Sequence, residues 1–446
     1  MDLEGKSLKG TFIKYIIPSI VAQWVYILYT VVDGIFVARG VGEMALTAVN
    51  IITPFTLGMF SLSITMAVGA STIVAIKLGE KDERGAKEVF SQNILLNIIV
   101  SVVVTIGVFL NLDGFARFLG ATEANMLYVT EYLKGLAPFA FSFILSYSFE
   151  MLVKTDGFPQ IAVWVVTAGS ALNIFLDWLL VIVFPFGVYG AAFATGVSNT
   201  VVILLYLIHF FGKKGTIKFC SFKWRWGYVW RIFRNGLSSG ITDFSSGIIV
   251  FFFNRAIIQY LNEESLIAYT IVTYVQCLAL YTMVGISQGY QPLIGYCFGA
   301  GEKKKCRALL KYGIAAALVF TVLIVGVCEI FARPIVTMFI ANTAENSALI
   351  DYSAGVFRIF SLSYLLIGLN VVPSGYFMSV EESSYASIIS TSRGIAALLI
   401  FLVLFILIWG GPGIWWSPLA AEAATLILTV YFLIRYENRE KKKCAL

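Results

Sequence analysis

The sequence predicts an all-α, polytopic membrane protein whose twelve transmembrane helices form two pseudo-symmetric bundles of six. Three observations lead to this prediction. Of the 446 residues, 59% are apolar and 13% are charged, and the mean hydropathy of +0.85 lies far outside the range of soluble domains. The apolar residues form runs long enough for a bilayer core, which needs about 20 helical residues. The second half of the chain also repeats features of the first half.

Twelve apolar runs, separated by short polar loops, account for almost the whole chain. Each run is long enough for a membrane-spanning helix, because a helix rises about 1.5 Å per residue. The expected helices cover residues 12–38, 44–78, 86–110, 125–152, 159–184, 188–211, 228–258, 265–298, 306–331, 347–379, 384–409 and 414–436.

Most of the 32 Lys and Arg residues fall on one side of this arrangement. The largest group lies between the two halves and comprises Lys213, Lys214, Lys218, Lys223, Arg225, Arg231 and Arg234. Lys154 counts toward the same side. Because Lys and Arg are enriched in cytoplasmic loops, we expect a multi-pass protein of the plasma (inner) membrane with both termini in the cytoplasm. The basic group is expected to anchor this topology rather than to bind nucleic acid or anionic lipid.

An internal repeat appears when the chain is shifted by 220 residues. Residues 43–48, EMALTA, then fall on residues 263–268, EESLIA, and Gly79 falls on Gly299. Each repeat holds an even number of spans and keeps its orientation, so a pseudo-twofold axis along the membrane normal is expected. Many transporters have this design.

The repeat predicts three segments. Residues 1–211 form an N-terminal six-helix lobe, residues 212–227 form a basic cytoplasmic linker, and residues 228–446 form a C-terminal six-helix lobe. A transporter of this kind is expected to move one lobe against the other around a central cavity.

Polar residues of three helices in the first half are expected at one depth in the membrane. Asp33, Asp177 and Thr195 each lie about 8 to 10 Å below the outer boundary, at about 1.5 Å per residue. Asn173 shares a helix face with Asp177, one turn away. A carboxylate facing lipid is costly, so these groups should face the protein interior, where they would take up a proton or hold a sodium ion. The alternative is that both acids only satisfy buried neighbours.

The second half does not repeat this polar cluster. The positions that correspond to the two acids and the threonine are Phe253, Phe401 and Pro418. None of these side chains can take up a proton or offer an oxygen atom. The ion chemistry is therefore expected to be asymmetric.

The second half has its own polar candidates in Asp243, Arg393 and Glu422. Asp243 and Arg393 are expected at similar depth, so they could form a structural ion pair with each other or contact a substrate. An enzyme would need a nucleophile with its base or a metal cluster. The single histidine, His209, and the absence of a Cys/His spacing argue against one.

Three stretches resemble the multidrug and toxic compound extrusion (MATE) family. They are TVVDGIFVARGVGEMALTAVNI, SALNIFLDWLLVIVFPFGVYGAAFATGVS and GISQGYQPLIGYCFGAG. The likeness extends over nearly the whole chain and implies twelve helices in two lobes that form a V, with drug export driven by protons or sodium ions.

The resemblance also implies roles for individual residues. The membrane acid of the first helix falls on Asp33, the Asn and Asp of the fifth helix fall on Asn173 and Asp177, and the threonine of the sixth falls on Thr195. Pro18 occupies the place of a proline associated with helix bending. Two departures are visible, because the seventh helix offers Asp243 in place of a common Glu, and the glycine usual before Arg39 is missing.

Together these observations predict a secondary active multidrug exporter. It would couple inward movement of H⁺ or Na⁺ to outward transport of amphipathic, often cationic, organic compounds by alternating access, and so confer drug resistance. Met, Phe and Tyr side chains would adapt to varied substrates. The expected partners are these substrates, the coupling cation and the lipid bilayer, with no cofactor and no nucleic acid, and we expect a monomer. The alternative is a flippase for a lipid-linked precursor, although few basic groups are expected inside the membrane.

Overall fold

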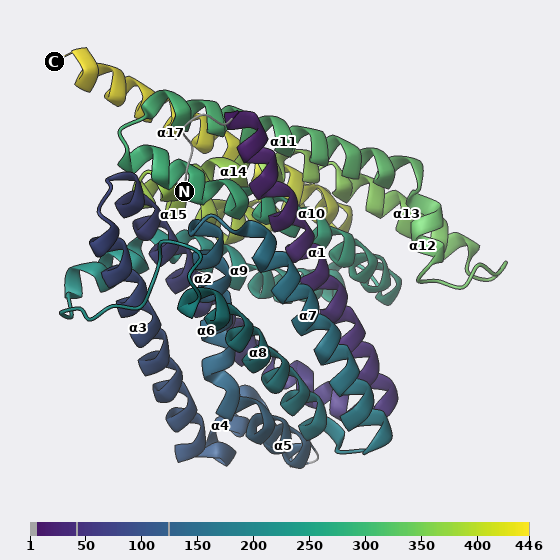
Figure 1. Cartoon of the computed structure of the whole chain (residues 1–446). Helices are drawn as coiled ribbons and strands as arrows, with labels where there is room; N and C mark the ends of the chain where they lie inside the picture. Colours follow the sequence, from purple (N-terminus) through teal and green to yellow (C-terminus); the bar gives the residue numbers. More distant parts are fainter. Residues whose placement is uncertain (1–6, 42, 124, 446) are drawn as a thin grey trace.

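The computed structural model describes residues 7–41, 43–123 and 125–445 of the chain. Within these residues twelve helical segments are long and apolar enough to cross a membrane. They begin and end within a few residues of the predicted helices. The prediction of an all-α, polytopic membrane protein is confirmed (Figure 1).

The first six spans include two that change helix type along their length. The spans consist of α1 (Leu8–Gly40), α2 (Glu43–Gly79), α3 (Glu83–Leu110), α5 (Met126–Leu136) continued through a 3-10 turn into α6 (Ala140–Thr155), α7 (Pro159–Asp177) continued by the π-helical turn η2 (Trp178–Val183), and α8 (Gly187–Phe211). The short helix α4 (Leu112–Leu119), which the hydropathy pattern did not predict, lies between the third and fourth spans.

The last six spans repeat this layout. They consist of α9 (Trp226–Tyr260), α10 (Glu263–Gly299), α11 (Lys303–Ile330), α13 (Ser347–Ser361) followed by α14 (Tyr364–Ser379), α15 (Ser383–Thr391) continued through the π-helical turn η3 (Ser392–Ala396) into α16 (Ala397–Trp409), and the 3-10 turn η4 (Gly411–Trp416) followed by α17 (Ser417–Ala445). The short helix α12 (Ala332–Thr337) takes the place that α4 has in the first half.

The first two helices of each half contact the first two helices of the other half. Helix α1 packs along α10, and α2 packs along α9. The sequence repeat exchanges these two pairs, since it relates α1 to α9 and α2 to α10. Helices α2 and α10 also cross each other. The four helices therefore form the centre of the molecule around a pseudo-twofold relation.

Glycines allow α2 and α10 to cross at very short distance. A Cβ atom at Gly79 would lie 2.0 Å from the carbonyl oxygen of Tyr296, and a Cβ atom at Gly299 would lie 2.1 Å from that of Ile76. These two glycines are the pair that the repeat relates. The backbones meet so closely because neither glycine has a side chain.

The start of α1 and the end of α17 lie at one end of the molecule, and the two bundles diverge from it. In Figure 1, α3 runs downward from this end whereas α11 runs to the right, so the bundles form a V. The loops 80–82, 212–225 and 300–302 lie at the same end, which we call the basic end. The Asp156 carboxylate holds the long loop there, because it accepts hydrogen bonds from the backbone N–H groups of Thr216 (2.7 Å) and Ile217 (3.0 Å) and contacts His209 Nε2 (2.8 Å).

The start of each half packs into the core of the other half. Phe12, Tyr15 and Ile16 of α1 belong to the buried apolar cluster of the second half. Val229 and Ile232 of α9 belong to a cluster of the first half. The two bundles are therefore interlocked at the basic end.

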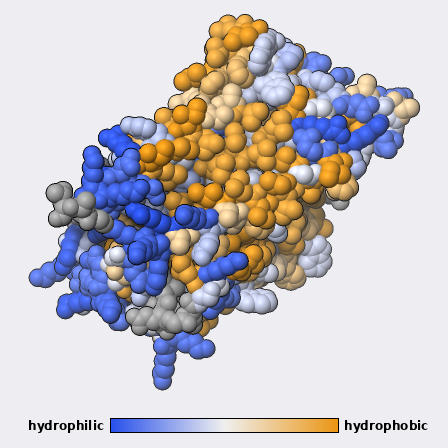
Figure 2. Space-filling view, turned by 90° about the horizontal axis from the view of Figure 1, so that it is seen from above, coloured by the Kyte–Doolittle hydropathy of each residue, from blue (hydrophilic) through white to orange (hydrophobic). Residues whose placement is uncertain are grey.

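A broad apolar surface covers the middle of the face seen in Figure 2. Figure 2 shows it between hydrophilic residues at the two ends. Exposed side chains such as Val103 and Ile106 on α3, and Val322 and Leu323 on α11, contribute to this surface. Water would penalise so much exposed apolar area, whereas lipid accommodates it, so the chain is a multi-pass membrane protein.

Candidate functional site

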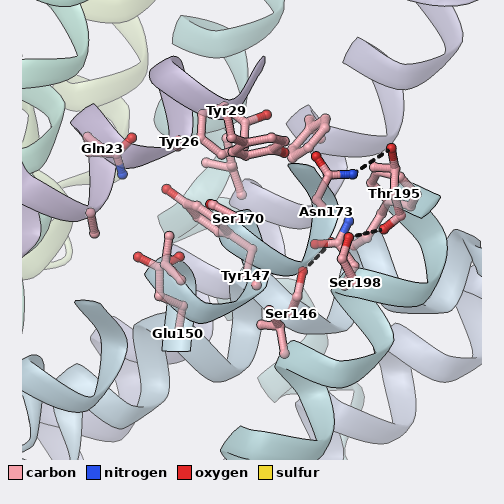
Figure 3. A pocket seen from close by; sticks show the side chains of 18 of the residues that line it. Gln23, Tyr26, Tyr29, Ser146, Tyr147, Glu150, Ser170, Asn173, Thr195 and Ser198 are labelled. Carbon is pink, nitrogen blue, oxygen red and sulfur yellow. Dashed lines mark hydrogen bonds between the residues drawn. The ribbon is translucent and has the colours of Figure 1, made fainter. Parts of the chain in front are cut away.

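A cavity of about 860 Å³ lies between the two halves of the chain. Most of its wall comes from α1, α2, α6, α7 and α8 of the first half, and α9 and α10 complete it. Figure 3 shows its polar side chains, which include Gln23, Ser146, Tyr147, Glu150, Ser170, Asn173, Thr195 and Ser198. The cavity therefore joins a polar first-half wall to residues of the second half.

Aromatic rings form one side of this cavity. Tyr26 meets Tyr29 edge to face, with ring centroids 5.2 Å apart, and it contacts Phe60 in the same way at 5.8 Å. The ring of Tyr281 on α10 lies 6.4 Å away across the boundary between the halves. The sequence analysis did not identify these rings, although Tyr26, Tyr29 and Asp33 have the spacing of one helix face.

Asp33 and Asp177 lie beside the cavity. Asp33 belongs to α1 and Asp177 is the last residue of α7, and these two helices pack along each other. The two carboxyl groups are close enough to influence each other electrostatically. Oδ1 of Asp33 and both carboxylate oxygens of Asp177 are buried, and no protein donor in the described chain reaches them. Since two buried carboxylates near each other repel, the pair is suited to take up one positive charge.

Asn173 and Thr195 connect this pair to the cavity. Asn173 Nδ2 donates to Thr195 Oγ1 over 3.4 Å, and the Thr195 hydroxyl donates to the Ala191 carbonyl oxygen over 3.0 Å. Both side chains line the cavity wall (Figure 3). Asn173 Oδ1 is buried and has no donor among the described residues. The structure thus brings together the four side chains that depth matching selected.

The oxygen atoms of this cluster are hard ligands. No group of three or more His, Cys, Asp or Glu side chains in the described chain is placed to hold a metal ion. Two carboxylates, an amide oxygen and a hydroxyl suit a proton or a sodium ion better than a transition metal. The donor set is compatible with either coupling cation considered from the sequence.

A π-helical turn begins directly after Asp177. Residues Trp178–Val183 wind in this wider form before the span ends. Such turns break the regular hydrogen-bond ladder and occur often at functional sites. Asp177 is therefore at a point where the helix can change its winding.

Pro18 lies inside α1, which continues through it without a break. Proline has no N–H group, so a carbonyl group one turn earlier lacks its helical partner. This part of α1 touches α10, where a Cβ atom at Gly289 would lie 2.8 Å from Ile16 Cα. Pro18 is thus at the crossing of the halves, several turns from Asp33.

Asp243 of α9 lies where the first cavity meets a second one of about 620 Å³. Its Oδ1 atom accepts a hydrogen bond from the Tyr281 hydroxyl over 3.3 Å. Its Oδ2 atom is buried and receives no donor from the described chain. Asp243 is therefore an acid that a cationic ligand could approach from either cavity.

Arg393 does not pair with Asp243, which was one of the two possibilities derived from the sequence. Its Nε and Nη2 atoms contact Glu422 Oε1 at 3.0 and 2.9 Å, and Asn370 Nδ2 donates to Glu422 Oε2 over 2.7 Å. The pairing also depends on which face each helix turns inward. Depth along a helix therefore did not reveal it. Glu422 is accordingly a partner of Arg393 and not a free acid.

Glu150 and Lys154 form a second buried pair that the sequence analysis missed. Their Oε1 and Nζ atoms are 2.6 Å apart, and Lys154 is 0% exposed. The sequence analysis counted Lys154 among the basic residues of one side, and the structure shows that its charge is buried against Glu150. The four-residue spacing of an acid and a base was the available signal.

Hydrogen bonds connect the halves beside the cavity. Gln23 Nε2 donates to Gln288 Oε1 over 3.0 Å, and Gln288 Nε2 donates to the Tyr147 hydroxyl. Trp24 Nε1 donates to Thr282 Oγ1 over 2.9 Å. These bonds hold α1, α6 and α10 together at the level of the aromatic wall.

Comparisons with known proteins agree with this architecture. The chain is 24% identical over 443 residues to the multidrug export protein MepA of Staphylococcus saprophyticus, covering 96% of this chain and 95% of the relative. A solved structure of MATE in complex with MaL6 matches with a TM-score of 0.91 at 24% identity and covers 98% of both chains. The outward-facing structure of a multidrug resistance MATE family transporter of the MOP superfamily also has a TM-score of 0.91 at 24% identity, covering 98% of this chain and 97% of that one. The MatE family model matches residues 18–179 and 245–402. The chain therefore belongs to the MatE family, the family that its sequence motifs resemble.

Proposed function

We propose that this protein is a secondary active exporter that couples inward movement of H⁺ or Na⁺ to outward transport of amphipathic, often cationic, organic compounds. The observation that carries the proposal is the buried pair of Asp33 and Asp177 beside a cavity shared by both halves. The name of the staphylococcal relative, a multidrug export protein, supports the export of several drugs.

The coupling cation acts by changing the charge of this pair. A cation that enters from outside neutralises the Asp33 and Asp177 carboxyl groups, with Asn173 and Thr195 supplying further oxygen atoms. It can drive the cycle only if it binds one conformation better than the other. A buried pair of acids without protein donors has such a preference, because closing the site around an uncompensated charge is costly.

The two lobes, residues 1–211 and 228–446, move against each other about the linker 212–227. In this proposal the basic end faces the cytoplasm, in accord with the Lys and Arg distribution. The V in Figure 1 is then open to the outside. Substrate enters after the central helices separate at the basic end.

Substrate binding rests on the aromatic wall and on Asp243. Tyr26, Tyr29 and Tyr281 present flat apolar faces, and cations bind favourably over such faces. Asp243 Oδ2, which lacks a protein donor, attracts a cationic group. A flippase for a lipid-linked pyrophosphate would need several basic groups in its cavity. Among the residues that line the three described cavities, Arg393 is the single basic one.

Transport in reconstituted vesicles tests the proposal. Purified protein is placed in liposomes with a fluorescent amphipathic cation, the membrane potential is clamped, and a proton gradient or a sodium gradient is imposed separately. One of the gradients should drive dye movement against its concentration difference, and Asp33→Asn should abolish this movement. If the rate of dye movement is the same with and without each gradient, cation coupling is contradicted.

A further inference from the structure

The cavity of about 620 Å³, most of whose lining comes from the second half, has many hydroxyl groups in its wall. They include those of Ser238, Ser239, Thr242, Ser246, Ser374 and Ser390. Ser390 Oγ lies 2.7 Å from Ser238 Oγ and accepts from Thr242 Oγ1 over 3.0 Å. These hydroxyl groups have partners within the protein, so they make the wall polar without requiring a ligand.

Two acceptor atoms on this cavity have no donor in the described chain. They are Asp243 Oδ2 and Gln291 Oε1, and both are buried. The other polar atoms of these side chains are engaged, since Tyr281 donates to Asp243 Oδ1 and Gln291 Nε2 donates to Ser287 Oγ over 3.0 Å. A ligand that brings N–H groups, such as an ammonium, would satisfy both acceptors.

Arg393 offers the complementary chemistry to the same cavity. Its side chain is 9% exposed and lines this cavity and a third one of about 670 Å³. Glu422 engages the guanidinium through Nε and Nη2. In the described chain Nη1 makes no hydrogen bond, so this edge of the planar group remains available to a ligand.

The guanidinium is held in place by a chain of buried contacts. Glu422 accepts from Asn370 Nδ2, and Asn370 Oδ1 accepts from the Thr429 hydroxyl over 2.8 Å. Arg393 also lies in the π-helical turn Ser392–Ala396. A planar fork fixed in this way loses little freedom when it binds a carboxylate.

The first half has a glycine, Gly169, at the corresponding position, where a Cβ atom would lie 2.2 Å from Val202 Cγ2. Gly157 and Glu381 both have positive φ and precede the fifth and eleventh spans. Arg393 follows Glu381 at the same distance along the chain as Gly169 follows Gly157. Gly169 lines the first cavity. The guanidinium is therefore a feature of the second half alone.

We propose that Arg393 is a specificity-determining residue that selects substrates with a carboxylate or another strong acceptor in addition to a cationic amine. Zwitterionic amphiphiles would place the amine at Asp243 and the acceptor at Arg393, across the hydroxyl-lined cavity. Substrates that are only cationic would use Asp243 without this second contact. The inference rests on the proposed export function and adds the second recognition group.

Binding of a matched pair of dyes tests the proposal. One dye is a rhodamine methyl ester, a monocation, and the other is the same rhodamine as the free acid, a zwitterion. Fluorescence anisotropy with purified protein gives the affinity for each, and the measured quantity is the ratio of acid to ester affinity. Arg393→Met combined with Glu422→Met removes the ion pair without leaving a lone buried charge. A lost charged hydrogen bond should lower this ratio about tenfold.

Glu422→Gln is the matched variant in the opposite direction. It keeps Arg393 and removes the competing carboxylate, so the acid-to-ester ratio should rise. Melting temperature and elution volume check that each variant is folded. If both variants change the two affinities alike, Arg393 has only a structural role and the proposal is wrong.

Transport of the ester separates this proposal from the one on which it rests. Ion-driven uptake of the ester with an unchanged dye ratio in the variants would refute only the role of Arg393. Failure of wild-type protein to move either dye under any gradient would contradict the export function, and the role of Arg393 with it.

Discussion

The glycine contact between α2 and α10 provides a sharp test of how the basic end closes. In the variant Gly79→Ala with Gly299→Ala, each new Cβ atom would lie near 2 Å from a carbonyl oxygen, at 2.0 Å from Tyr296 and 2.1 Å from Ile76. Carbon and oxygen atoms in ordinary contact are more than about 3 Å apart, so the helices must separate by about 1 Å or more. We expect the variant to favour a state in which the basic end is open.

The magnitude follows from the cost of overpacking. An added methyl group in a close contact costs about 1 to 3 kcal/mol, and 1.4 kcal/mol changes an equilibrium constant about tenfold. The two sites are neighbours, so their costs need not add. The open-to-closed ratio should therefore rise about tenfold or more.

Spin-label distances at the basic end can measure this shift. Labels at Arg84 of α3 and Lys304 of α11, both exposed, report the separation of the two halves there. The double variant should populate longer distances than the labelled parent protein. Gly107→Ala and Gly326→Ala are matched controls, because nothing lies within 4 Å of a Cβ atom at either position. If the distance distribution of the double variant equals those of the control variants, the reasoning is refuted.

Three further predictions concern the polar sites. Asp177→Asn should abolish cation-driven efflux while the protein remains folded in the membrane, because the change preserves size but removes the group that takes up charge; normal drug extrusion at equal expression would count against this. In Pro18→Ala, label distances from α1 should respond less to the coupling cation than in wild type, because a regular helix hydrogen bond is restored; an equal response in both proteins would show that Pro18 has no part in bending. Asp33→Asn should impair export of every compound alike, whereas Asp243→Asn should change the resistance profile over cationic and neutral drugs more than it changes ion dependence. A reshuffled drug profile for Asp33→Asn with coupling intact would reverse this assignment.

The first-half cluster could be predicted because depth in a membrane can be read directly from position in a helix. An apolar run must be helical to satisfy its backbone hydrogen bonds, and each residue then advances by a constant rise. Asp33, Asp177 and Thr195 were placed at one depth on this basis, and the structure brings them together with Asn173. Their role in ion coupling stays a prediction.

The second-half partners could not be predicted in the same way. Depth along a helix does not determine which face turns inward or which neighbour it meets. Arg393 accordingly pairs with Glu422 instead of Asp243, and Lys154 is buried against Glu150 although its sequence position suggested a loop. Side-chain direction and helix packing decided both pairs.

The sequence alone determined the helical class, the number of spans and the repeat, because composition, run length and regular spacing are local properties of the chain. Only the tertiary structure revealed the close approach of Gly79 and Gly299, the aromatic wall around Tyr26, and the unpaired edge of Arg393. Each of these features depends on residues from different helices, whose rotation and crossing are set by packing across the whole molecule.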